Sequence, residues 1–178
     1  MNFIAIHGIL YKMKIHSETL TIIGRAERAD LLDLNLKKVP VKIDTGADAS
    51  SIWAHVAEEE GDNLKVVFFG EGSEFYSGEV HLFSRDEFTI TRVANSFGHR
   101  EIRYKVKLRI KLKGRIINGT FTLSDRSQKL YPILIGRALL TKKFIVDVSK
   151  GSPLRTAEKE RAHKLQQTIE VLKGDKAL

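Results

Sequence analysis

The sequence predicts a mainly β fold that ends in a C-terminal helix. Apolar and polar residues alternate with period two in several stretches, and glycine-containing turns separate these stretches. Helical periodicity, in contrast, begins only after residue 150. We therefore expect an N-terminal arm over residues 1–18, one β domain over residues 19–150 and a helical tail over residues 151–178.

In the first half of the domain, apolar residues recur with the period of β-strands. The expected strands cover residues 19–24, 31–36, 39–43, 64–69, 80–83 and 88–93. Residues 25–30 are rich in charge and are expected to form an exposed turn or edge. The acidic run 58–63 is expected to be a loop, and residues 50–56 are compatible with a short strand or an exposed connection.

The most regular alternation begins at Ile102. The apolar set, predicted to face the core, consists of Ile102, Tyr104, Val106, Leu108, Ile110 and Leu112. The basic set on the other face consists of Arg103, Lys105, Lys107, Arg109, Lys111 and Lys113. A turn at Gly114 and a partner strand over residues 115–123 should follow. A buried strand over 133–135, a helical turn over 137–141 and a last strand over 144–148 complete the domain.

Two readings of the basic face remain open. It can be a solvated outer face with acidic neighbours on adjacent strands, or it can bind an anionic partner such as an acidic peptide or nucleic acid. Nucleic acid is the less favoured partner, because Tyr104 is the strand's one aromatic residue and points to the apolar face.

The tail has the signals of one helix. Ser152 and Pro153 provide a cap residue and a first-turn proline, and Gly174 can end the helix. The apolar stripe consists of Ala162, Leu165, Ile169 and Leu172. Such a helix can lie on the surface of the β domain or pair with a partner chain.

Composition narrows the class of protein. The 178 residues include 42% hydrophobic and 29% charged residues, as in a globular protein, with a net charge of +8 that favours acidic partners. The absence of cysteine excludes disulfides and thiol chemistry and is compatible with a reducing compartment. Because no apolar run approaches the ~18 residues of a membrane span, and no leader pattern is seen, we expect a cytoplasmic location and no membrane contact.

No metal or cofactor is expected. The six histidines form neither a His-Glu-x-x-His motif nor any i, i+4 pair. There is no glycine-rich phosphate-binding loop ending in Gly-Lys, and no Gly-x-Ser-x-Gly nucleophile motif.

Residues 41–46 carry the candidate catalytic chemistry. Val41 and Ile43 alternate with Lys42 as in a half-buried strand, and Asp44, Thr45 and Gly46 follow at once. A carboxylate on a sharp turn after a buried strand is held rigidly and presented outward. Taken alone, the same tripeptide is also an ordinary strand-ending turn.

A second segment, Ile133–Arg137, supports the functional interpretation. Asp-Thr-Gly-Ala-Asp followed by apolar-apolar-Gly-Arg resembles the retropepsin-like aspartic peptidases. The span from Leu20 to Val148 is similar to a bacterial retropepsin-like family formerly labelled ATP-dependent zinc proteases. The matching pieces are Ile22–Arg25, Lys42–Ala47, Gly98–Glu101, Asp125-Arg126, Ile135–Arg137 and Val146-Asp147. The resemblance implies a retropepsin-like closed β-barrel, one half of an acid protease, with the helix appended.

The resemblance also implies an activity. Aspartic peptidases hold two carboxylates against one water, and the pair acts as base and acid together. Because this chain contains one Asp-Thr-Gly, the second carboxylate would be Asp44 of another copy, which requires a two-fold homodimer. The expected function is an aspartic endopeptidase acting on a peptide or protein, with an acidic substrate as one candidate. The alternative is a retropepsin-fold protein that binds peptide or nucleic acid with little or no proteolysis.

The same resemblance assigns supporting roles. Thr45, Gly46, Gly136 and Arg137 would support the active site, with Thr45 bonding across the dimer axis and Arg137 pairing with Asp48. The residues that would bind substrate are Ala47, Asp48, Phe97, Gly98 and His99, the last three at the tip of a flap. Ala138 departs from the retroviral pattern, which has Asn after Gly-Arg, and the interval from Asp44 to Gly98 is longer.

Overall fold

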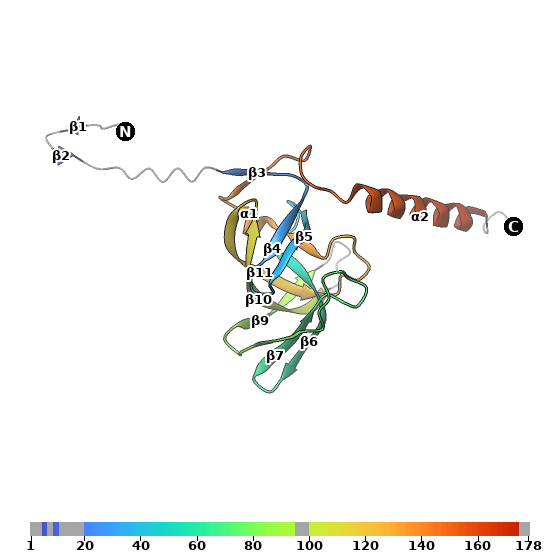
Figure 1. The fold of residues 1–178 in the computed structure, drawn as a ribbon, viewed down its shortest axis with the longest axis horizontal. Helices are drawn as coiled ribbons and strands as arrows, with labels where there is room; N and C mark the ends of the chain where they lie inside the picture. Colours follow the sequence, from blue (N-terminus) through green and yellow to red (C-terminus); the bar gives the residue numbers. More distant parts are fainter. Residues whose placement is uncertain (1–4, 7–8, 11–19, 95–99, 175–178) are drawn as a thin grey trace.

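The computed structural model describes residues 5–6, 9–10, 20–94 and 100–174 as a β-barrel with a helix outside it (Figure 1). The strands are β1 (Ala5–Ile6), β2 (Ile9–Leu10), β3 (Thr21–Ile23), β4 (Ala26–Leu31), β5 (Leu36–Ile43), β6 (Ser50–Glu60), β7 (Asn63–Phe68), β8 (Val80–Phe83), β9 (Phe88–Ala94), β10 (Arg100–Leu112), β11 (Arg115–Ser124), β12 (Ile133–Ile135) and β13 (Phe144–Val146). The helices are α1 (Arg137–Leu140) and α2 (Arg155–Gly174).

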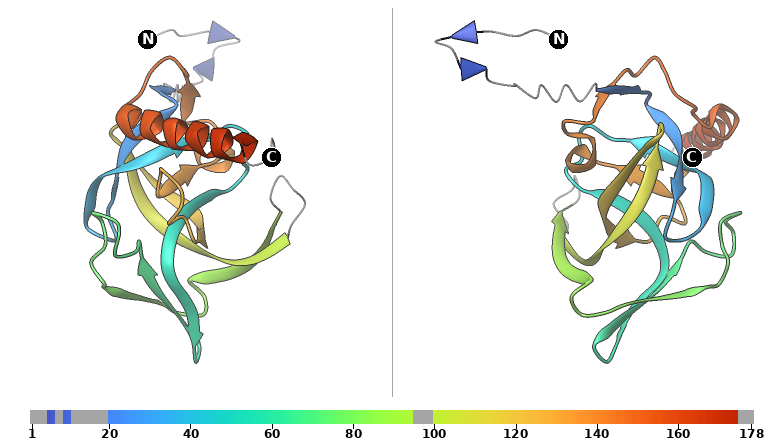
Figure 2. Two further views of the ribbon diagram at one scale, coloured as in Figure 1. Left: turned by 90° about the vertical axis from the view of Figure 1, so that its right-hand side faces the viewer. Right: turned by 60° about the vertical axis from the view of Figure 1, so that its left-hand side comes forward.

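The barrel closes through hydrogen bonding between strands that are distant in sequence. The order β11-β10-β4-β5-β12-β6 is closed by a parallel pairing of β11 with β6. β12 lies between β5 and β6, parallel to the first and antiparallel to the second. Two further views show the same barrel with α2 outside its wall (Figure 2). The predicted mainly β closed barrel with a C-terminal helix is therefore confirmed.

β10 shows how the alternation builds the core. Val106, Leu108, Ile110 and Leu112 are buried, and the basic residues between them face outward. Ile102, which was expected to face the core, is 70% exposed. The reason is that this part of β10 pairs with β9 before β10 reaches β11 and β4, so no opposing wall covers it.

The prediction of an exposed turn at residues 25–30 is wrong. They contribute most of β4, which lies between β10 and β5, and Ala26 and Ala29 are buried. Glu27 is buried too. Its buried carboxylate has partners, because it accepts the Gly24 N–H over 2.7 Å and pairs with Lys113 at 3.0 Å. The expected strand over 31–36 is mostly a turn, which occupies residues 32–35.

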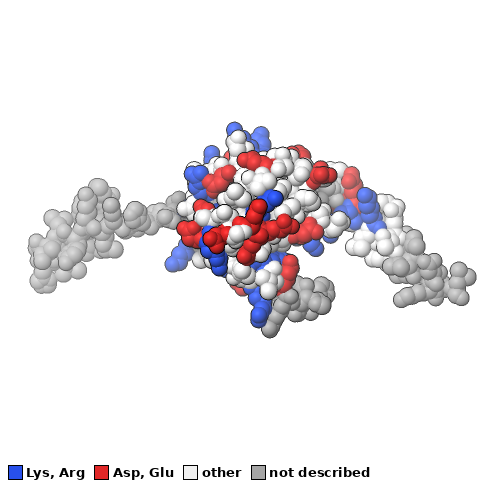
Figure 3. All heavy atoms as spheres, turned by 90° about the horizontal axis from the view of Figure 1, so that it is seen from below, with Lys and Arg blue, Asp and Glu red and all other residues white. Residues whose placement is uncertain are grey.

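The acidic run was also misassigned as a loop. Glu58, Glu59 and Glu60 belong to β6 and pair with β7, and the turn is confined to Gly61 and Asp62. Gly61 has φ +61°, which a glycine adopts without strain. Seen from below, acidic side chains run across the middle of the molecule and basic ones lie around them (Figure 3).

The tail helix begins at Arg155, two residues after the predicted proline start. Its apolar stripe does not lie on the barrel, because Ala162, Leu165 and Ile169 are exposed, and α2 runs away from the barrel (Figure 1). Within the described residues, no helix is both long and apolar enough to cross a membrane.

Candidate active site

The end of β5 presents Asp44 on a tight turn. Val41 and Ile43 are buried beneath it, and the Asp44 N–H donates to the Ile135 carbonyl of β12 over 2.9 Å. The N–H groups of Gly46 and Ala47 donate to Asp44 Oδ1 over 3.0 and 3.2 Å. The turn is thus folded around the carboxylate, which remains partly exposed.

The segment that starts at Gly136 supports this loop from below. The N–H groups of Arg137 and Ala138 donate to the carbonyls of Ala47 and Asp48 over 2.8 and 3.1 Å. The Arg137 guanidinium also forms the predicted ion pair with the Asp48 carboxylate. Gly136 N–H donates to Ser50 Oγ over 3.0 Å. Two segments about ninety residues apart are therefore fastened together by backbone and side-chain hydrogen bonds.

Gly136→Ala is expected to destabilise the fold by on the order of 1–3 kcal/mol, the usual effect of overpacking. An added Cβ would lie 2.5 Å from the Ala49 carbonyl oxygen and 2.9 Å from that of Asp48, and these backbone atoms cannot yield cheaply. Denaturant unfolding measures the effect. Gly72→Ala is the matched control, since nothing lies within 4 Å of its Cβ position. Equal stability of the two variants would contradict the steric argument.

The remaining predicted site residues are Thr45 and the three residues of the expected flap tip. Thr45 is exposed, and its expected bond across a two-fold axis needs a second chain. Phe97, Gly98 and His99 lie outside the described residues. The strands that flank them, β9 and β10, do pair as an antiparallel hairpin, with Ala94 opposite Arg100.

Arg126 lies near the site, and the sequence predicted no role for it. Its Nη1 donates to Ser51 Oγ over 2.9 Å and its Nε donates to the Tyr131 carbonyl over 3.1 Å. Burial lowers the pKa of the Arg126 guanidinium from its ordinary value, the positive charge of Arg103 lowers it further, and the charge of Asp44 opposes both. The sequence contained one signal, the match of the Asp125-Arg126 pair to the retropepsin-like family. That match did not indicate that Arg126 lies near Asp44.

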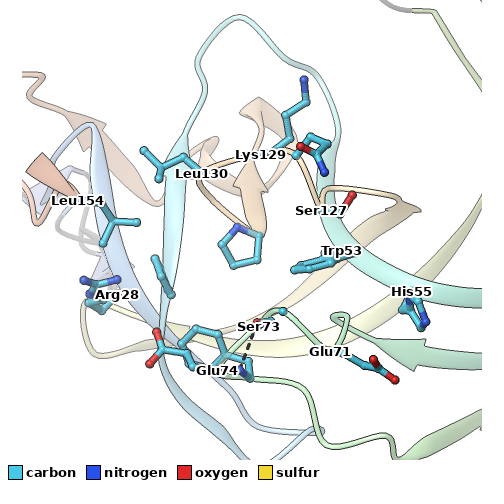
Figure 4. A pocket seen from close by; sticks show the side chains of 15 residues that line it. Arg28, Trp53, His55, Glu71, Ser73, Glu74, Ser127, Lys129, Leu130 and Leu154 are labelled. Carbon is cyan, nitrogen blue, oxygen red and sulfur yellow. Dashed lines mark hydrogen bonds between the residues drawn. The ribbon is translucent and has the colours of Figure 1, made fainter. Parts of the chain in front are cut away.

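One large cavity is lined by none of the predicted site residues. It measures about 590 Å³, and Trp53 and His55 of β6 line it together with the loop from Glu71 to Phe75 (Figure 4). A second cavity of about 350 Å³ shares Lys129 and Leu130 with the first and is therefore adjacent to it.

The lining of the second cavity comes mainly from the loop after β11 and from α2. It is lined by Lys42, Arg126, Lys129, Leu130, Tyr131, Leu134, Glu158 and Arg161. Lys42 precedes Asp44 by two residues, and the guanidinium of Arg126 interacts electrostatically with Asp44. Asp44 itself lines neither this cavity nor the larger one.

Glu158 fastens the start of α2 next to this cavity. Arg25 donates to both of its carboxylate oxygens, over 3.1 and 2.7 Å, and the Tyr131 hydroxyl donates over 2.8 Å. The hydrogen bonds from Arg25 hold the pKa of Glu158 below its ordinary value, against the opposing effect of burial. Tyr131 Oη also accepts the Leu154 N–H over 3.0 Å, so one cluster orients both the helix and the chain leading to it.

Glu158→Gln is expected to loosen the start of α2 at neutral pH, because the ion pair with Arg25 is lost. Because the pKa of Glu158 is lower in the folded than in the unfolded state, its ionisation stabilises the fold at pH values above the unfolded pKa of about 4.3. This stabilisation is lost as the pH falls through the folded-state pKa. Hydrogen exchange in the first turn of α2 should therefore differ between wild type and variant at pH 7 and converge in acid. Glu160→Gln, at an exposed position, is the control. A difference that persists unchanged in acid would contradict this account.

Three of the six basic residues that alternate from Arg103 to Lys113, the last of them in the turn after β10, are paired with carboxylates. Arg103 pairs with Glu101, Arg109 pairs with Asp33, and Lys113 pairs with Glu27. Two of these carboxylates, Asp33 and Glu27, come from outside β10, which favours the reading of an outer face with acidic neighbours. Across the described ranges, no group of three His, Cys, Asp or Glu side chains is arranged to hold a metal ion.

A closed barrel that carries an Asp-Thr-Gly turn supported by an Ile-Gly-Arg segment defines a retropepsin-like protein. The family model described as "RimB-like: Retropepsin-like aspartic endopeptidase RimB" matches residues 22–155, and the chain belongs to this family.

Comparison with curated and solved proteins adds two kinds of relative. Proteins named "Probable alpha-L-glutamate ligase" are each 28% identical, over 163 residues in Desulfotalea psychrophila and 145 in Shewanella pealeana, which are 86% and 76% of this chain. The chain spans only about a third of the length of these relatives, 33% and 30%. The crystal structure of Lpg0085, a protein of unknown function from Legionella pneumophila, is similar with a TM-score of 0.51 and 26% identity over 74% of this chain and 95% of that one.

Proposed function

We propose that this protein is a homodimeric aspartic endopeptidase in which Asp44 of each chain supplies one catalytic carboxylate. The observation that carries the proposal is the Asp44 turn itself. Its carboxylate accepts hydrogen bonds from Gly46 and Ala47, and the Ile135–Ala138 segment holds the loop in place. The description of the matching family, an aspartic endopeptidase, supports the same reaction class.

The proposed chemistry follows from placing two Asp44 carboxylates together. Two carboxyl groups at close range cannot both ionise easily, so the pair shares one proton. The ionised member takes a proton from a bound water, which attacks the peptide carbonyl carbon. The protonated member donates to the carbonyl oxygen, and a proton then goes to the leaving amine as the C–N bond breaks.

For the substrate, we propose a peptide rich in acidic residues. The net charge of +8 favours an anionic partner. The relatives that contain a similar stretch are named as glutamate ligases, and a peptidase of this kind would suit a glutamate-bearing peptide. Nucleic acid is a less suitable partner, because the basic strand offers no aromatic stacking platform.

A binding module is the second candidate, and those same relatives favour it. They carry the similar stretch within proteins named for a ligase, where it could hold a peptide without cleaving it. The barrel and the Asp44 turn are compatible with both candidates, so turnover decides between them.

The test is cleavage of a mixed peptide library by the 178-residue chain, from roughly pH 3 to pH 8, which spans the ordinary pKa of an aspartic acid and neutral pH. Mass spectrometry identifies the cleaved bonds, and light scattering on the same sample gives the molecular mass. Internal cleavage by a dimer is the expected result. A protein that binds acidic peptides but cleaves none at any pH is the binding module.

A further inference from the structure

Arg126 has a fixed orientation in the loop that follows β11. Its Nη1 donates to Ser51 Oγ over 2.9 Å, and its Nε donates to the Tyr131 carbonyl oxygen over 3.1 Å. Ser51 belongs to β6, and Tyr131 lies two residues before β12. Because two N–H groups of one planar guanidinium are bonded at once, the group cannot rotate freely. Its positive charge is therefore held in one place relative to both strands.

The same two strands support the Asp44 turn. Ser51 of β6 is in register with Leu134 of β12. The next residue of β12, Ile135, accepts the Asp44 N–H on its carbonyl oxygen over 2.9 Å. Arg126 is therefore connected to the backbone of the Asp44 turn through β6 and β12.

The charge of Arg126 acts on Asp44 and is not neutralised by a nearer carboxylate. The two charged groups interact electrostatically. Both side-chain hydrogen bonds of Arg126 go to neutral acceptors, and the described residues form no ion pair with it. Arg126 is also half-buried, and water screens a half-buried charge less than an exposed one.

The other charged groups nearby are paired or exposed to water. Arg103 of β10, which repels Arg126, pairs with Glu101 at 2.7 Å, and Glu158 of α2 is bonded by Arg25. The remaining charged side chains are the exposed Lys42, Lys129 and Arg161 around the second cavity, and the ion pair of Asp48 with Arg137 on the Asp44 loop. Arg126 is therefore the unpaired cation that water screens least among these described groups.

We propose that Arg126 is a positioning residue for the reaction at Asp44, and that its fixed positive charge favours the ionised form of the Asp44 carboxyl group. A cation near a carboxyl group stabilises the carboxylate. In the proposed dyad one member is ionised and acts as the base, while the other is protonated and acts as the acid. Arg126 therefore moves the pH range in which the dyad is active to lower values. This role rests on the endopeptidase function proposed above.

The test is the pH dependence of kcat/KM for wild type, Arg126→Gln and Arg126→Lys. Activity of a dyad is lost at low pH, where both members are protonated, and at high pH, where both are ionised. Arg126→Gln should move both limbs to higher pH by about half a unit, less than the roughly 1–3 units of a direct ion pair. Activity relative to the maximum should then fall about threefold on the acid limb and rise about threefold on the alkaline limb.

Arg126→Lys keeps the charge and loses the planar fork. Both limbs should stay in place, while kcat/KM falls by a similar factor at every pH, because a lysine cannot make both hydrogen bonds in the same geometry. Thermal unfolding shows whether each variant is folded. A purely structural role would lower the activity of both variants by a factor that does not change with pH. Unmoved limbs in a folded Arg126→Gln protein would overturn the inference.

Arg109→Gln is the matched control, because Arg109 also fixes a neighbouring segment, by donating from its guanidinium to Asp33 over 2.6 Å. It removes the same charge from the chain, but from the outer face of β10. Its two limbs should coincide with those of wild type. A shift as large as that of Arg126→Gln would mean that net charge, and not the position of Arg126, is responsible, and it would also overturn the inference.

A measurement that needs no cleavage separates this role from the function on which it rests. The ¹³C NMR signal of the Asp44 side-chain carboxyl follows its ionisation, and its titration should move to higher pH in Arg126→Gln but not in Arg126→Lys. If it moves while no peptide is cleaved, the role of Arg126 stands and the endopeptidase fails. If peptides are cleaved while neither the limbs nor the signal move, the endopeptidase stands and the role of Arg126 fails.

Discussion

Asp44→Asn is expected to reduce peptide cleavage by a factor on the order of 10³ or more while leaving the fold intact. The loss should be this large because the carboxylate acts both as base and, with its partner, as acid, and members of such a unit cannot replace one another. The fold should persist because the asparagine carbonyl oxygen can accept the same bonds from Gly46 and Ala47. Steady-state kcat/KM on a cleaved peptide, together with thermal unfolding, measures both effects.

The matched control is Asp62→Asn, which removes an exposed carboxylate from the β6–β7 turn. It should leave kcat/KM unchanged. An Asp44→Asn protein with wild-type turnover would exclude Asp44 as the catalytic carboxylate, and it would leave the barrel as a binding module.

The strand-and-turn pattern around Asp44 could be predicted from the sequence because its signals are local. Alternation of Val41 and Ile43, followed by Asp-Thr-Gly, specifies a strand and a tight turn without reference to the rest of the chain. The support from Ile135 to Arg137 came from resemblance to a family, and the structure adds the hydrogen bonds that join the two segments. Contacts between segments that are so far apart in the sequence leave no periodic signal in it.

The misassigned segments share a physical cause. β4 is rich in charge, yet its two alanines face the core and its buried Glu27 is paired with Lys113 of the β10–β11 turn. Composition alone cannot reveal a partner so distant. The acidic cavity-lining residue Glu158 is a stronger case, since its partner Arg25 lies 133 residues away. The second cavity, to which Glu158 contributes, could therefore not be predicted from the positions of Lys42 and Arg126 in the sequence.

If two chains associate as proposed, an exposed apolar face is available to the second chain. β3 and β13 form a small parallel ribbon in which Ile22 lies opposite Ile145, and both side chains are about half exposed. The ribbon leads toward the Asp44 turn, because Arg25, two residues after β3, accepts the Ile43 N–H over 3.0 Å. Two copies that bury this face against each other would remove apolar surface from water and bring their Asp44 turns toward one axis.

Ile145→Asp is accordingly expected to yield a folded monomer that does not cleave peptide. In a dimer that buries this face the new carboxylate would be left without a partner, whereas in the monomer it faces water. Light scattering should change from twice the chain mass to the single-chain value of 20.1 kDa, with cleavage lost in parallel. Leu82→Asp is the matched control, since Leu82 is similarly exposed on β8 at the far end of the sheet order.

Mixing experiments test the shared dyad independently of where the interface lies. After subunit exchange between equal amounts of wild type and Asp44→Asn, random pairing leaves roughly a quarter of the dimers with two intact carboxylates. Activity should therefore fall to roughly a quarter of that of the same total amount of wild type, and specific activity should also fall on dilution as dimers dissociate. Retention of roughly half the activity would mean that each chain works alone. In that case Asp44 would need a different partner group, and the requirement for a homodimer would be withdrawn.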